Sequence, residues 1–147
     1  MVYQFRFDRV LTVKEREQKE EEDRYRESIE SFEAIAQKLY HLLKQKEMME
    51  QNQADQIKTG IPVQSLRHGQ HFLTNIEKSI AHQQKLVIEA RTNMQWHEQK
   101  LMDRNIEVKK YEKIKEKDYK KHLIQVNDLD HRRMDELSMM QYMKSRK

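Results

Sequence analysis

The chain has 147 residues, of which 37% are charged and 36% hydrophobic, and its formal net charge is +4. So small an apolar fraction argues against a compact globular core, while only two glycines and one proline argue against disorder, collagen and linker sequence. Because strong helix formers such as Glu, Lys, Gln, Leu and Met dominate, the remaining class is a long helical coiled coil.

The composition also predicts where the chain works. It has no cysteine, which favours a reducing compartment. The first ten residues lack the apolar core of a signal peptide, and no stretch approaches the ~20 apolar residues of a membrane span. We therefore expect a cytoplasmic protein without direct membrane insertion.

The first predicted helix runs from about residue 8 to 58. Residues 14–24 contain no apolar side chain, which favours a solvated helix surface. An apolar stripe then follows at alternating spacings of four and three, as in a coiled coil. Its members are Tyr25, Ile29, Phe32, Ala36, Leu39 and Leu43, and Ile35, Leu42 and Met49 form a second line that widens the face.

Every strong breaker of regular structure lies in residues 58–72. Gly60 suits the left-handed residue that ends a helix, and Pro62 suits the start of the next one. A connection this short favours antiparallel packing. We therefore predict one coiled-coil hairpin over residues 1–147, with a bend at 59–62, which brings Leu11 near Val108 and Tyr25 near Trp96.

The second predicted helix, about 63–142, carries a strict heptad. Its main line is Leu66, Leu73, Ile80, Val87, Met94, Leu101 and Val108, and the companion line is Ile76, Gln83, Ala90, His97, Arg104 and Tyr111. This helix outruns the first from about Lys120, although apolar residues recur to Tyr142. The apolar residues beyond Lys120 have two interpretations: they form a surface for an external partner, or they belong to a frayed tail.

The residue pattern indicates no enzyme, cofactor or metal site. A two-helix coiled coil offers no enclosed pocket, and phosphate loops and Cys/His clusters are missing from the sequence. His68 and His71 have the spacing of a metal pair but lack a third ligand beside them. The basic run 109–122 favours a solvated face or docking to an acidic protein over nucleic acid.

Several stretches carry a resemblance to a known family. They are YQFRFDRVL, SFEAIAQKLY, VQSLRHGQHFLTNIEKSI, KLVIEARTNM, DRNIEVKKYEKIKEK and RRMDELSMMQYM, in one register over nearly the whole chain. The chain resembles the FliJ family of flagellar type III protein-export components, most closely members from Bacillus-like organisms. The resemblance implies an antiparallel two-helix coiled coil that is not an enzyme.

The resemblance also implies partners. Family members act as a stalk in the pore of the hexameric export ATPase, contact the cytoplasmic domain of the export gate, and in some cases help to recycle export chaperones. Localisation would then be cytoplasmic, peripherally associated with the cytoplasmic face of the cell membrane.

Two sets of residues inherit these roles. The resemblance places ATPase binding at the end that carries both termini, on Phe5, Phe7, Arg9, Leu11, Arg132, Arg133, Met134, Asp135, Glu136 and Leu137. It places gate binding beside the bend, on Leu42, Met49, Phe72, Ile76 and Ile80. Ile76 and Ile80 have an equal alternative as coiled-coil core, whereas Phe72 lies one position off the main heptad line.

Two further functions are compatible with this sequence. Exposed apolar faces could capture helical partners, as in a chaperone-binding adaptor. The same faces could instead join copies of the chain in a self-associating structural spacer.

Overall fold

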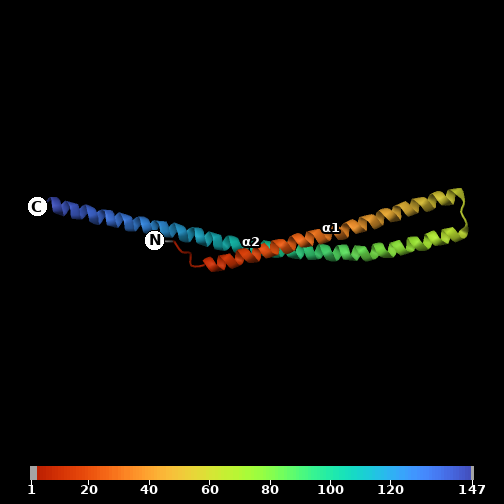
Figure 1. Cartoon of the computed structure of the whole chain (residues 1–147), viewed down its shortest axis with the longest axis horizontal. Helices are drawn as coiled ribbons and strands as arrows, with labels where there is room; N and C mark the ends of the chain where they lie inside the picture. Colours follow the sequence, from red (N-terminus) through yellow and green to blue (C-terminus); the bar gives the residue numbers. More distant parts are fainter. Residues whose placement is uncertain (1–2, 147) are drawn as a thin grey trace. The chain divides into compact units, whose positions relative to one another are not determined.

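The structure is a computed structural model that describes residues 3–146. It contains helix α1, Asp8–Thr59, and helix α2, Val63–Ser145, and no strand among the described residues (Figure 1). The expected helix bounds agree within three residues at each end. The all-α helical hairpin expected from the sequence is confirmed.

The bend follows the chemistry of its breakers. Gly60 has a φ of 78°, which is the left-handed conformation that an L side chain rarely adopts. The Thr59 hydroxyl donates to the Gln56 carbonyl at 3.1 Å, in the last turn of α1. The Pro62 carbonyl then accepts from the amides of Ser65 and Leu66 and starts α2. The breakers therefore mark one turn between two helices.

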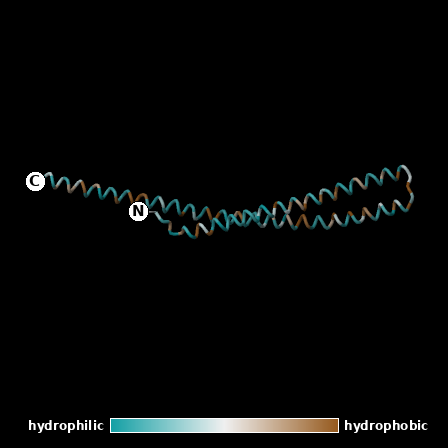
Figure 2. The backbone as a smooth tube through the Cα atoms, in the orientation of Figure 1, coloured by the Kyte–Doolittle hydropathy of each residue, from teal (hydrophilic) through white to brown (hydrophobic). Residues whose placement is uncertain are grey.

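The contacts divide the chain into two compact units, and both helices contribute a segment to each. We call Glu20–Met102 the bend unit, and residues 3–19 together with 103–146 the terminal unit. Along both helices, single hydrophobic positions recur between hydrophilic ones, as Figure 2 shows. Each unit is consequently held by a narrow seam.

Antiparallel pairing in the bend unit is defined by contacts between the helices. The Gln83 side-chain amide donates to the Ile35 carbonyl at 3.0 Å, and Lys46 Nζ lies 3.7 Å from Glu77 Oε1. Nearer the bend, Gly69 on α2 faces the Gln53 side chain on α1. Residue numbers fall along α1 as they rise along α2, which confirms the predicted reversal of the chain.

The seam on α2 is the predicted one. Leu73, Ile76 and Ile80 are buried, and the later members of both heptad lines are buried or half-buried in their respective units. Trp96 departs from the expectation. It is 56% exposed and its ring is covered by Lys100 Nζ at 4.6 Å, so it is not a core neighbour of Tyr25.

The seam on α1 differs in part from the prediction. Leu43 is 44% exposed, and Ile35, Leu42 and Met49 belong to the inward line rather than to its margin. In the bend unit this line is Glu21, Tyr25, Ser28, Phe32, Ile35, Leu39, Leu42, Lys46, Met49 and Gln53. Its alternating spacing of four and three is regular, but four members are polar, so apolar residues alone did not reveal it.

The terminal unit has a small aromatic and aliphatic core. Phe5, Leu11 and Val108 are buried together, with Tyr3, Tyr111 and Ile114 packed against them. The predicted contact of Leu11 with Val108 is confirmed. Residues 3–7 precede α1, and the Asp8 amide donates to the Phe5 carbonyl at 3.2 Å. This core fixes the N-terminal segment on α2.

Helix α2 continues beyond this core. The Tyr3 hydroxyl donates to Asp118 Oδ2 at 2.9 Å, and the Tyr3 ring also packs against Tyr119 and His122. Every described residue from 127 to 146 is exposed. We call residues 127–146 the tail segment. Nothing in the terminal unit covers it.

Candidate interaction surfaces

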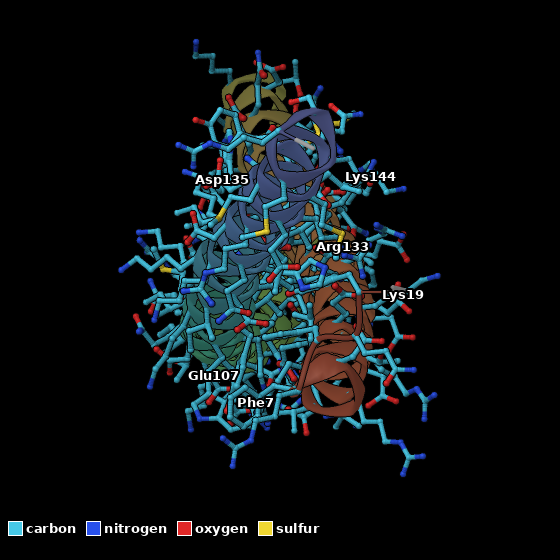
Figure 3. All side chains as sticks on the ribbon, turned by 90° about the vertical axis from the view of Figure 1, so that its left-hand side faces the viewer. Phe7, Lys19, Glu107, Arg133, Asp135 and Lys144 are labelled. Atoms are coloured by element: carbon cyan, nitrogen blue, oxygen red, sulfur yellow. The ribbon has the colours of Figure 1, made fainter. Side chains whose placement is uncertain are left out.

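The tail segment presents apolar side chains at helical spacing. Met134, Leu137 and Met140 follow at intervals of three and are 57–65% exposed. Arg133 and Asp135 point outward from different sides of α2, as Figure 3 shows. Arg132 and Glu136 are exposed as well. The six predicted ATPase-binding residues at 132–137 thus form a mixed apolar and charged surface.

The predicted N-terminal partners of this surface divide into two groups. Phe5 and Leu11 are 8% and 5% exposed, so they hold the terminal core and are not available for direct contact with another protein. Phe7 is 38% exposed, under the Arg6 guanidinium at 5.5 Å, and Arg9 is exposed. Only Phe7 and Arg9 therefore remain as surface candidates.

A pocket of about 450 Å³ lies beside the N-terminal segment. It is lined by Tyr3, Gln4, Phe5, Arg6, Asp8, Arg9 and Lys115. Lys115 Nζ is 3.6 Å from Asp8 Oδ1, so one cation of the pocket is already paired. Burial, and then its hydrogen bond to Asp118, raise the pKa of Tyr3 above 10.0 and keep the phenol protonated.

A polar cluster joins α1 and α2 near the apolar core of the terminal unit. Lys14 Nζ lies 3.2 Å from Glu107 Oε2, and this contact raises the pKa of Lys14. Glu107 Oε2 is buried without a well-aligned hydrogen bond, so its partners are the cations of Lys14 and Arg104. Arg104 also donates to Glu17 at 2.9 Å. These pairs align the two helices.

A hydrogen-bonded pair of Glu21 and His97 in the bend unit is not predicted from the sequence. Glu21 is 2% exposed, and its Oε1 lies 2.8 Å from His97 Nδ1, a geometry in which the ring N–H donates to the carboxylate. Arg24 Nη1 lies 3.6 Å from the other oxygen. The run 14–24 was interpreted as solvated. Spacing could have predicted that Glu21 faces inward, because it precedes Tyr25 by four residues on the inward line.

The five predicted gate-binding residues are not equally accessible. Ile76 and Ile80 are 7% exposed, so the alternative interpretation as coiled-coil core describes them. Phe72 is 53% exposed. Leu42 lines an open groove of about 380 Å³ with Lys38 and His82 among others, and Met49 lines a second groove of about 520 Å³ on α1. Three of the five can therefore contact a partner.

Among the described residues there is neither a candidate metal site nor a candidate membrane span. Between residues 3 and 146, no three His, Asp or Glu side chains are grouped so that they could hold a metal ion. Over the same residues, neither helix contains a stretch that is both apolar and long enough to cross a bilayer.

The fold and its surfaces define an all-α coiled-coil protein whose candidate binding residues lie on open helix faces. The family model described as flagellar FliJ protein matches residues 3–147. The chain is also 41% identical over 143 residues to the flagellar FliJ protein of Bacillus subtilis strain 168, covering 97% of each chain. No solved structure matches it significantly. The chain belongs to the FliJ family of flagellar proteins.

Proposed function

We propose that this protein is a non-enzymatic stalk of the flagellar export apparatus. It occupies the pore of the hexameric export ATPase, promotes assembly of that ring and couples it to the cytoplasmic domain of the export gate. Family membership supports the flagellar export setting. The observation that carries the docking mode is the exposed tail segment, whose apolar side chains have no cover in the terminal unit.

Docking by the tail segment combines two kinds of contact. Met134 and Leu137 supply apolar area that stabilises only when a partner buries it, by about 1.5–3 kcal/mol for each side chain. Arg132, Arg133, Asp135 and Glu136 present both signs of charge around them and set the register of the contact. Phe7 and Arg9, which are also exposed in the terminal unit, supply further contacts to the ATPase.

The coupling follows from symmetry. A single helical element in a six-fold pore contacts some ATPase subunits and not others at any moment. Contact energy that differs between subunit conformations shifts their populations. The stalk therefore favours ring assembly and orders the hydrolysis cycle without catalysing it.

Reconstitution with the export ATPase tests this role. Adding the chain is expected to increase hexamer formation, measured by light scattering, and the rate of ATP hydrolysis. The double variant Met134→Ser with Leu137→Ser is expected to lose both effects, because it removes the apolar contact from an already exposed surface.

The matched control is Met48→Ser with Ile57→Ser, two residues of the bend unit that are 67% and 63% exposed. It should stimulate the ATPase as the unchanged chain does. If the unchanged chain alters neither hexamer formation nor hydrolysis, the stalk role is wrong.

Gate binding is assigned to Phe72, with Leu42 and Met49 in the neighbouring grooves. Phe72→Ala is expected to weaken binding to the cytoplasmic domain of the gate about ten-fold, as for an exposed aromatic anchor. Calorimetric titration measures the affinity. The control is Ile88→Ala, which removes another α2 side chain that is 64% exposed. Equal affinities of Phe72→Ala and the unchanged chain would exclude this site.

Gate binding would hold the protein at the cytoplasmic face of the cell membrane as a peripheral component. Fractionation of cells that lack the gate tests this localisation. The protein is then expected to shift toward the cytoplasmic fraction.

A further inference from the structure

One side of α2 in the terminal unit is occupied by the N-terminal residues. Val108 is buried against Phe5 and Leu11, and the Tyr111 ring lies 6.3 Å from the ring of Phe7. Seven residues after Tyr111, the Asp118 carboxylate accepts a hydrogen bond from the Tyr3 hydroxyl. These α2 positions follow at spacings of three and seven, so they lie on one face. The opposite face of this stretch is free of α1.

That opposite face carries lysines and no acidic residue. At about 100° per residue, the outer sector of α2 between residues 106 and 127 is roughly 100° wide. It contains only Ile106, Lys109, Lys110, Lys113, Lys117, Lys120, Ile124 and Asn127. We call the five lysines the lysine face. All five are exposed, and the two isoleucines at its ends are 65% and 61% exposed.

Most of this charge is not neutralised within the chain. Between residues 3 and 146, no carboxylate forms an ion pair with Lys109, Lys110, Lys113 or Lys117. Lys120 alone reaches one, Glu116, at 3.3 Å. Elsewhere in the same unit Lys14 and Lys115 are paired with carboxylates. The lysine face is thus a positive stripe along about 17 Å of helix, and four of its five lysines have no ion-pair partner among the described residues.

We propose that the lysine face is a docking surface for anionic phospholipid. A row of exposed lysines on one side of a helix is attracted to the negative surface of a membrane, and each lysine near that surface strengthens binding about five-fold. Ile106 and Ile124 enter the headgroup boundary at the two ends. The helix lies on the bilayer and does not cross it.

The composition of the face favours lipid over other anionic partners. It contains no arginine, the residue best suited to fixed, bidentate recognition of carboxylates on a protein. It also contains no aromatic ring for stacking on bases, because Tyr111 packs toward Phe7 and Tyr119 lies against Tyr3. Fluid headgroups, by contrast, adapt to flexible lysines.

Vesicle co-sedimentation tests the proposal with the full chain. The chain is expected to bind vesicles of equal parts phosphatidylglycerol and phosphatidylcholine, to remain free with phosphatidylcholine alone, and to be released by salt. Replacing Lys109, Lys113, Lys117 and Lys120 with Gln is expected to weaken binding by about a hundred-fold or more. Ile106→Ser with Ile124→Ser should weaken it about ten-fold.

The matched control replaces four exposed lysines of the bend unit with Gln, namely Lys38, Lys44, Lys78 and Lys85. It changes the net charge equally and should bind anionic vesicles within a few-fold of the unchanged chain. Circular dichroism should show equal helicity in all variants, since every replaced side chain is exposed.

Three outcomes would overturn the proposal. One is equal binding to anionic and zwitterionic vesicles, or no binding to either kind of vesicle. A second is equal loss in the lysine-face variant and its bend-unit control, which would indicate net charge alone. A third is duplex DNA or an acidic protein displacing the chain from vesicles at stoichiometric amounts. The lysine face and the 132–137 surface are separate stretches of α2, so failure of one proposal leaves the other measurable.

Discussion

Glu21 and His97 show how a single polar pair can fix the packing of a narrow seam. Glu21 is almost fully buried, with His97 at 2.8 Å as its one close partner and Arg24 at 3.6 Å. A buried carboxylate is tolerated because this hydrogen bond and the nearby cation compensate for its lost hydration. The pair therefore makes one alignment of the two helices in the bend unit more stable than alignments in which one helix is shifted along the other.

His97→Ala is expected to lower the free energy of unfolding by about 3 kcal/mol, because it leaves the Glu21 carboxylate buried without its close donor. Joint replacement of Glu21 and His97 by Leu should recover most of this loss. Urea unfolding followed by circular dichroism measures both.

The exposed pair of Arg26 with Asp23 provides the control, since it joins two well-solvated side chains at 3.9 Å. Arg26→Ala should change stability by no more than about 0.5 kcal/mol. A His97→Ala effect as small as that would mean that the buried pair does not hold the seam.

At the scale of the helices, the two glycines have different roles. Gly60 ends α1 with a positive φ, whereas Gly69 lies inside α2, where an added Cβ would meet only the tip of the Gln53 side chain at 2.7 Å. The Gln53 side chain can move to make room for a Cβ at position 69. At position 60, by contrast, no side-chain movement relieves the strain of a left-handed backbone conformation. The sequence alone presents both as breakers of one loop.

Gly60→Ala is expected to destabilise the fold by about 1 kcal/mol, because alanine is strained at this φ. Gly69→Ala is expected to stabilise it by about 0.5 kcal/mol, because alanine favours a helix interior. Thermal unfolding distinguishes the two. Shifts in the same direction would contradict this assignment of the bend.

The sequence predicted the helices and the α2 seam because leucines and isoleucines at a spacing of seven leave few alternatives. It predicted the α1 seam less well, because Glu21, Ser28, Lys46 and Gln53 occupy inward positions that hydropathy assigns to solvent. Two of these polar groups have partners across the seam, His97 for Glu21 and Glu77 for Lys46. Such contacts cannot be read from either helix alone.

The candidate site was predicted in the same uneven way. Met134 and Leu137 lie on an exposed surface as expected, because no α1 residue remains to cover that part of α2. Phe5 and Leu11 were assigned to the same surface but form the terminal core with Val108. An aromatic N-terminal segment can cover its own helix or another protein, and only the folded chain distinguishes these two cases.

At the scale of the whole molecule, the two units differ in their balance of basic and acidic side chains. The terminal unit has 17 basic and 12 acidic side chains, and the bend unit has 11 and 13. Distinct partners can therefore be attracted to different parts of one chain. This distribution is compatible with the proposed ATPase and lipid contacts on the terminal unit and the proposed gate contacts on the bend unit.

Hydrogen–deuterium exchange with and without the export ATPase tests the central claim most directly, that the tail segment docks in the ATPase ring. Exposed helical amides of residues 127–146 should exchange quickly in the free chain and slow markedly on binding. The seam residues around Leu73–Ile80 should change little. Slowed exchange confined to the bend unit, or unchanged exchange in residues 127–146 of a complex that has formed, would contradict it.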